Sequence, residues 1–115
     1  MIELIEKKSK FLGYAFNVSS VAEVTKIIEG LKKEHKKCTH ICYAYSIKTG
    51  GVFERAVDDG EPSGTAGRPI LNVIQKKNLK DVLLVVVRYF GGIKLGAGGL
   101  VRAYTKAASG ACEEL

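Results

Sequence analysis

One segment of the chain, residues 88–102, has the composition of an anion-binding loop. Five of the thirteen glycines fall between Gly91 and Gly99, directly after an apolar run and directly before a helical pattern. Glycine at this density weakens regular structure, but it lets a ligand approach the backbone amides at the start of a helix. Basic side chains stand at both ends of the segment. We therefore expect an anion or a nucleic acid to bind at Arg68, Arg88, Gly91, Gly92, Lys94, Gly98, Gly99 and Arg102.

The spacing of this segment excludes the familiar phosphate-binding motifs. No glycine-lysine-serine/threonine triplet closes the loop, so it is not a Walker A motif. No glycine stands three positions after Gly98, and no acid lies about twenty residues further on, so it is not the dinucleotide fingerprint either. The glycines could equally serve close packing of a helix on a sheet, and both interpretations stay open.

A second segment, residues 58–68, gathers acidic and hydroxyl side chains. Three carboxylates within four residues could hold magnesium or supply a general base. They could also hydrogen-bond amides within a turn, or pair with the arginines of either segment. No hydroxyl here has a histidine beside it in the sequence, so we predict no catalytic residue. The polar candidates are Asp58, Asp59, Glu61, Ser63, Thr65 and His40.

The cysteines and histidines do not match a known metal site. Cys38, His40 and Cys42 are separated by single residues, with His35 nearby, which is not a usual zinc-ligand spacing. A buried cysteine without a partner mostly behaves as a small apolar residue. The odd number of cysteines, three, argues against a disulfide framework and favours a reducing compartment. We expect no metal ion and no cofactor.

The totals indicate one small basic domain, spanning residues 1–115. A chain of 115 residues can bury one core but is short for two. No apolar run approaches the length of a membrane span, and the charged N-terminus does not resemble a secretory signal, so we expect a cytoplasmic protein. The net charge of +6 favours an acidic partner such as nucleic acid. Four lysines at residues 32–37 end a predicted helix, where cations oppose the helix dipole.

Hydrophobic periodicity predicts an α+β fold. The expected strands cover residues 10–18, 40–48, 52–57 and 81–90, with a possible short strand before Ser9. Helices are expected from Ser20, from Thr65 as N-cap, and from about Gly99 to Glu114. The unbroken apolar run at residues 82–87 predicts a strand buried on both faces. We expect a mainly antiparallel sheet with its helices packed on one face, and the two glycine-rich loops meeting in one polar site at a sheet edge.

Two long motifs resemble the IMPACT family, including the bacterial YigZ-like proteins. They are DDGEPSGTAGRPIL at residues 58–71 and RYFGGIKLGAGGLVRAY at residues 88–104, and residues 9–12 and 40–45 also look like motifs of that family. The resemblance spans essentially the whole chain. It implies the ribosomal-protein-S-five second-domain-like fold, which is also found in domain IV of the translocating elongation factor and in the GHMP kinases.

The resemblance also implies a link to the regulation of translation. Eukaryotic relatives restrain activation of the kinase that phosphorylates the initiation factor, and they carry an additional N-terminal domain. Bacterial relatives usually add a small C-terminal ferredoxin-like domain. On this comparison the chain is either a stand-alone version of the shared domain or a fragment.

Three classes of function stay open at this point. The favoured one is a non-enzymatic binding module that contacts RNA, the ribosome or a translation factor. The second is a small-molecule or nucleotide-binding enzyme that uses the glycine-rich loops with Asp58 or Asp59. The third is a protein–protein interaction domain whose charge serves solubility. No membrane partner is expected, and the sequence does not indicate an oligomeric state.

Overall fold

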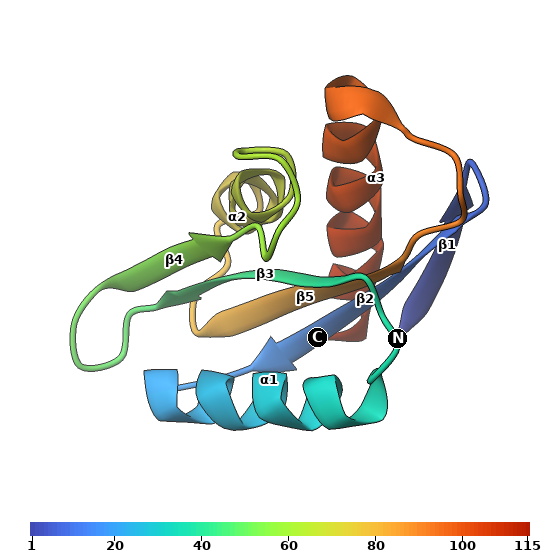
Figure 1. Ribbon diagram of the computed structural model, residues 1–115. Coiled ribbons are helices and arrows are strands. Elements are labelled where there is room, and N and C mark those ends of the chain that lie inside the picture. The colour runs from blue at the N-terminus through green and yellow to red at the C-terminus, as the bar shows by residue number, and fades with distance from the viewer.

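A five-stranded antiparallel sheet forms the centre of the structure, a computed structural model that describes residues 1–115 (Figure 1). Its strands are β1 (Ile2–Glu6), β2 (Ser9–Asn17), β3 (His40–Ile47), β4 (Phe53–Val57) and β5 (Val82–Tyr89). Their order across the sheet is β1-β2-β5-β3-β4, and every neighbouring pair is antiparallel. The last strand in the sequence therefore lies in the middle, between β2 and β3.

The helices cover both faces of this sheet (Figure 1). Helices α2 (Gly67–Lys76) and α3 (Gly96–Ala111) lie on one face, α1 (Val21–Glu34) lies on the other, and a short 3-10 turn (Cys112–Glu114) follows α3. The predicted α+β class and antiparallel sheet are confirmed, whereas the prediction that the helices share one face is wrong. The physical reason lies in β5, because a strand that is apolar on both faces needs a cover on each.

Alternating side chains of β5 divide the interior into two cores. Leu84 and Val86 pack under α2 and α3, while Leu83, Val85 and Val87 pack under α1. All five are completely buried, as the unbroken apolar run predicts. Because β5 is buried along nearly its whole length, it holds the start of the glycine-rich segment firmly in place.

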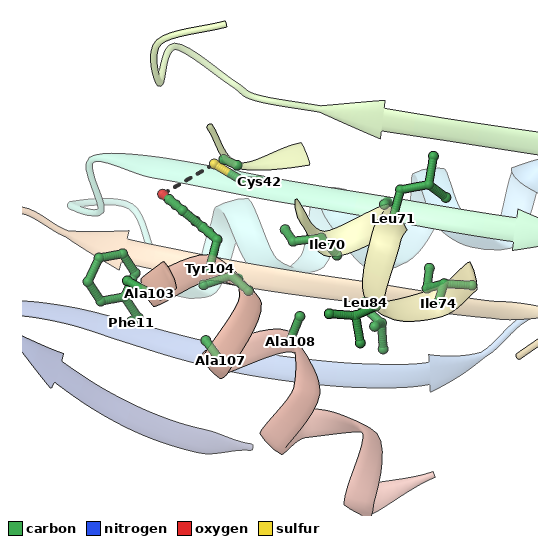
Figure 2. Close-up of a cluster of buried hydrophobic side chains, with 14 of the residues drawn as sticks. Phe11, Cys42, Ile70, Leu71, Ile74, Leu84, Ala103, Tyr104, Ala107 and Ala108 are labelled. Carbon is green, nitrogen blue, oxygen red and sulfur yellow. Dashed lines mark hydrogen bonds between the residues drawn. The ribbon is translucent and has the colours of Figure 1, made fainter. Parts of the chain in front are cut away.

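Small residues let α3 lie close to the sheet. Figure 2 shows Ala103, Ala107 and Ala108 facing β2 and β5, with Tyr104 reaching from the same helix toward Cys42. The Tyr104 ring meets Phe11 of β2 edge to face, with ring centres 5.3 Å apart. Both aromatic rings are fully buried, and this contact fixes the first half of α3 against the sheet.

The first helix forms as its sequence predicts. Ser20 is the N-cap, and its hydroxyl oxygen accepts a hydrogen bond from the amide of Glu23. The Glu23 carboxylate in return accepts from the amide and hydroxyl of Ser19. Val24, Ile28 and Leu31 form the buried stripe of this helix.

Two helix starts differ from the predictions. Helix α3 begins at Gly96 rather than Gly99, because burial of its apolar stripe outweighs a cost of about 1 kcal/mol for each helical glycine. It ends at Ala111 rather than Glu114, and the last three predicted residues form the 3-10 turn. The N-cap of α2 is Ala66 rather than Thr65, whose hydroxyl instead donates to the carbonyl of Pro62 at 2.6 Å. The ends of the four predicted strands shift by at most one residue, and the short strand expected before Ser9 is β1. None of the helices is both long and apolar enough to cross a membrane.

Candidate functional site

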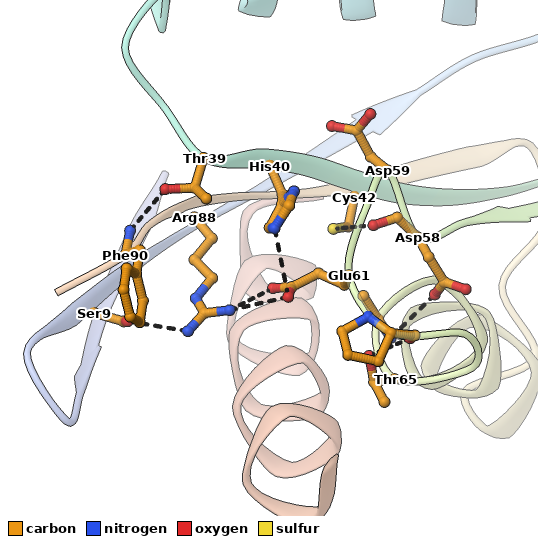
Figure 3. Close-up of polar contacts among 12 residues, drawn as sticks. Ser9, Thr39, His40, Cys42, Asp58, Asp59, Glu61, Thr65, Arg88 and Phe90 are labelled. Atoms are coloured by element: carbon orange, nitrogen blue, oxygen red, sulfur yellow. Dashed lines mark hydrogen bonds and ion pairs between the residues drawn. The ribbon is translucent and has the colours of Figure 1, made fainter. Parts of the chain in front are cut away.

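Polar side chains converge at the end of the sheet where β5 finishes and β3 begins (Figure 3). The loop at residues 58–66 closes over this end, and α3 passes beside it. We call the group of Ser9, His40, Cys42, Glu61, Arg88 and Tyr104 the Glu61 cluster. The two segments that the sequence singled out meet here, through Glu61 of one and Arg88 of the other, and Tyr104 joins them from α3.

The register of three strands places the members of this cluster. Arg88 of β5 is paired with Phe11 of β2 on one side and with His40 of β3 on the other. Since residues in register share a face of the sheet, all three side chains lie on the face that α2 and α3 cover. Arg88 follows Leu84 and Val86 at a spacing of two, so the inward face of β5 ends in a charge.

Glu61 neutralises that charge. The Nη1 atom of Arg88 donates to both carboxylate oxygens of Glu61, at 3.0 and 2.8 Å. Arg88 is only 5% exposed and Glu61 7%, so water does not screen the pair. His40 contributes from the side, with Nε2 3.6 Å from Oε1 of Glu61. The acid segment and the glycine-rich segment are therefore joined by a buried ion pair.

Two phenylalanines enclose the guanidinium group of Arg88. Its central carbon lies 5.4 Å from the ring centres of both Phe11 and Phe90. The Nη2 atom donates to the hydroxyl of Ser9 at 3.3 Å, whereas Nε is buried without a hydrogen-bond partner. Phe90 lies beside Arg88 in Figure 3, and because it is 48% exposed, it forms the side of this enclosure that faces solvent. Arg88 is thus enclosed by the protein and paired with an acid of the other segment, which is one of the two roles that the sequence left open for it.

Tyr104 and Cys42 complete the cluster as proton donors. The Tyr104 hydroxyl donates to Glu61, and the Cys42 thiol lies 3.0 Å from the carbonyl oxygen of Asp58 and 3.4 Å from the Tyr104 hydroxyl. Burial raises the pKa of the Tyr104 hydroxyl, and the nearby thiol and carboxylate raise it further. Burial likewise raises the pKa of the Cys42 thiol. Both groups keep their protons at neutral pH, so neither is an activated nucleophile.

The other two acids of the loop are also engaged by internal donors. The Asp58 carboxylate accepts hydrogen bonds from the amides of Gly64, Ala66 and Gly67 at 2.9, 3.2 and 2.8 Å, and thereby caps α2. Asp59 accepts from the amide of Ile41 at 2.7 Å. The three carboxylates point to different partners, and the structure contains no group of three or more metal-ligating side chains.

We expect the Asp58 cap to make stability depend on pH. Burial acts to raise the pKa of the Asp58 carboxyl, but the hydrogen bonds from Gly64, Gly67 and Ala66 outweigh it, so the pKa is lowered. This contribution is present above the unfolded aspartate pKa of about 3.9 and is lost as pH falls through the folded value. Asp58→Ala should cost about 1–2 kcal/mol at neutral pH, and the difference from wild type should shrink below about pH 4. Thermal unfolding of both proteins against pH measures this, and a constant difference would contradict the assignment.

The glycine-rich loop is held against the β1–β2 turn. The Gly91 amide donates to the Ser9 hydroxyl at 3.2 Å. A Cβ atom at Gly91 would lie 2.0 Å from the carbonyl oxygen of Lys8, so only glycine fits there. The backbone of this loop therefore packs closely against the backbone of the β1–β2 turn at Gly91.

None of the remaining predicted residues joins the Glu61 cluster, and most of them lie at the surface. Lys94 and Arg102 are exposed, and the Arg102 side chain lies over Gly98, where a Cβ would be 3.3 Å from Nη1. Gly92 is exposed and Gly99 half-buried. Arg68 is exposed in the first turn of α2, and Ser63 is exposed in the loop. Thr65 is buried and serves the loop backbone.

Sequence reasoning missed four members of this environment. Tyr104, Cys42, Ser9 and Phe11 contact Arg88 or Glu61 directly or through one neighbour, yet none carries a charge that would single it out. The available signal was strand register, since Ser9 and Phe11 lie in the strand that pairs with the end of β5. A sequence gives the strands more readily than it gives their pairing.

A family comparison decides the relationship. The model of the Impact N-terminal domain matches residues 7–112 of the chain. The chain belongs to the IMPACT family. The IMPACT family member YvyE of Bacillus subtilis is 51% identical over 107 residues, which cover 93% of this chain and 49% of YvyE. The chain thus spans about half the length of the curated IMPACT relatives that it matches.

Solved structures agree with the IMPACT assignment. A crystal structure of a hypothetical protein superposes with a TM-score of 0.88 at 33% identity, covering 99% of this chain and 56% of the other. The two-domain translational regulator Yih1 superposes with a TM-score of 0.63 at 26% identity, covering 95% of this chain and 45% of Yih1. The fold and the family are thereby established, and one structural relative is a regulator of translation.

Proposed function

We propose that this domain is a non-enzymatic, cytoplasmic binding module of the translation apparatus that contacts RNA, free or in the ribosome. The observation that carries the proposal is that the exposed basic side chains predicted to bind an anion are unpaired, while the acidic side chains of this region are not. The acids of this region are used internally, while Arg68, Lys94 and Arg102 are exposed and form no salt bridge. Exposed cations without acidic neighbours attract the phosphates of a nucleic acid.

The structure changes which residues we assign to the contact. Arg88 supports the scaffold, since its guanidinium is enclosed and paired with Glu61. The buried contacts of the Glu61 cluster fix the start of the glycine-rich segment. The exposed charges of this segment are those of Lys94 and Arg102. The similarity to Yih1, which is described as a translational regulator, supports a role in the same process.

We expect Arg102 to contribute more to RNA binding than any single lysine at the end of α1. A guanidinium offers paired donors to phosphate oxygens, and the Arg102 side chain is exposed with no acidic partner. Arg102→Ala should weaken binding to single-stranded RNA about tenfold at low salt, as measured by fluorescence anisotropy. Lys33→Ala, at the far side of the sheet, is the matched control. If Lys33→Ala weakens binding and a folded Arg102→Ala variant does not, the contact surface is the end of α1.

Capture from a cell lysate tests the proposal against its alternatives. The chain is used as bait with and without nuclease treatment, and captured RNA and proteins are identified. Recovery of RNA and ribosomal proteins that disappears with nuclease supports the proposal. Partners that survive nuclease indicate a protein-interaction domain and contradict RNA contact. Magnesium-dependent binding of a nucleotide, measured by calorimetry, would favour the enzyme alternative.

A further inference from the structure

An open groove lies between the β1–β2 turn and α3, apart from the Glu61 cluster. Its volume is about 460 Å³, and its lining includes Glu6, Lys7, Leu95, Val101, Arg102 and Lys106. The side chains of Leu95 and Val101 give it an apolar part, and Val101 is 37% exposed. Cavities of several hundred Å³ are large enough for a nucleotide-sized group.

The lining of this groove is basic. Lys7, Arg102 and Lys106 contribute three cations, and Glu6 contributes one anion. Glu6 lies 3.8 Å from the Lys106 amine, and this exposed pair is weak because water screens it. Lys7 and Arg102 have no acidic partner, so their charge is free for a ligand.

The turn that carries Lys7 is formed by unfavourable residues. Glu6 pairs with Ser9, so the hairpin has a two-residue loop, and its residues Lys7 and Lys8 have φ angles of 46° and 67°. Two-residue hairpin turns with both central residues in this region strongly favour Asn-Gly, because a Cβ atom is strained at positive φ, least so in Asn, and glycine has none. The sequence has two lysines instead, beside a groove that contains two further basic side chains.

We propose that the β1–β2 turn and α3 form a seat for the sugar–phosphate backbone of single-stranded RNA. Lys7, Arg102 and Lys106 bind successive phosphates, Lys8 adds charge at the tip of the turn, and the apolar part around Leu95 and Val101 faces the nucleoside. This inference rests on the proposed function. It adds the place on the domain where RNA binds and specifies that the RNA is single-stranded. Lys7 and Lys8 then bind the ligand, although they make the turn less stable than Asn-Gly would.

Replacing the two turn residues separates their effect on RNA affinity from their effect on stability. The double variant Lys7→Asn/Lys8→Gly supplies the preferred turn residues and removes two charges. We expect its thermal midpoint to rise by a few degrees while its affinity for a fluorescent single-stranded RNA falls at least about fivefold at low salt. The control Lys32→Ala/Lys33→Ala removes the same charge from the end of α1 and should change affinity less than twofold, by about the effect of net charge alone.

A second variant tests the groove without touching the turn. Thr105→Glu places a carboxylate in its lining and should weaken RNA binding to a similar extent. If wild type binds RNA and neither groove variant binds more weakly than the α1 control, the groove is not the RNA-binding site, and the proposed function stands. If wild type does not bind RNA, the proposed function fails, and the groove assignment fails with it. A lowered midpoint for the turn variant would show that the lysines serve the fold, and it would overturn the inference as well.

Discussion

Glu61→Ala should destabilise the domain by about 3–5 kcal/mol, the largest loss that we expect from any single substitution of a charged residue here. The variant leaves the Arg88 guanidinium buried with one hydrogen bond, to Ser9, and with no counter-charge. It also removes the acceptor of the Tyr104 hydroxyl. Because small domains are stable by only about 5–15 kcal/mol, urea denaturation should show a midpoint shift that is easily measured.

Two further variants give this prediction its controls. Glu3→Ala removes an exposed glutamate of β1 and should change stability by about 0.5 kcal/mol or less. The double variant Glu61→Leu/Arg88→Met replaces the pair by apolar side chains and should recover much of the loss, since no charge is then buried alone. A loss below about 1 kcal/mol for Glu61→Ala would mean that the ion pair does not hold the two segments together.

Gly91→Ala should cost about 2–3 kcal/mol or more, because the added methyl group would lie 2.0 Å from the carbonyl oxygen of Lys8. A backbone atom cannot swing away as a side chain can, so either the β1–β2 turn or the glycine-rich loop has to shift. The strain should also disturb the hydrogen bond from the Gly91 amide to Ser9. Urea denaturation measures the loss, and an amide exchange experiment would locate it at these two segments.

Gly30→Ala is the matched glycine control. Gly30 lies inside α1, and a Cβ there meets no atom within 4 Å. The same substitution should therefore stabilise the protein by about 0.5–1 kcal/mol, as alanine does in an open helical position. Opposite signs at the two glycines are expected, and a stable Gly91→Ala variant would contradict the close approach of the two segments.

The strands and the class of the fold could be predicted from local pattern, because alternation and apolar runs report burial directly. The side of the sheet on which α1 lies could not, since its apolar stripe fits either face equally well. The unbroken apolar run of β5 did carry the missing information. A central strand buried on both faces excludes a sheet with helices on one face only.

The candidate site shows the same contrast between what the local sequence predicts and what depends on distant contacts. The acids and arginines stood out by type, but the sequence could not say that Glu61, rather than Asp58 or Asp59, meets Arg88. That pairing depends on the loop conformation, in which Asp58 caps α2 and turns Glu61 inward. Arg88 was predicted to bind a ligand because it stands at one end of the glycine-rich segment. Its partner is 27 residues away in sequence, so its burial was not visible in the local pattern.

Salt dependence of RNA binding tests the central claim most directly. The intact chain is titrated into a fluorescent single-stranded RNA at several salt concentrations, for example between about 50 and 200 mM. If Lys7, Arg102 and Lys106 contact phosphates, the logarithm of the association constant should fall linearly with the logarithm of the salt concentration, with a slope of about −2. Absence of binding at the lowest salt, or an affinity that does not change with salt, would contradict the account.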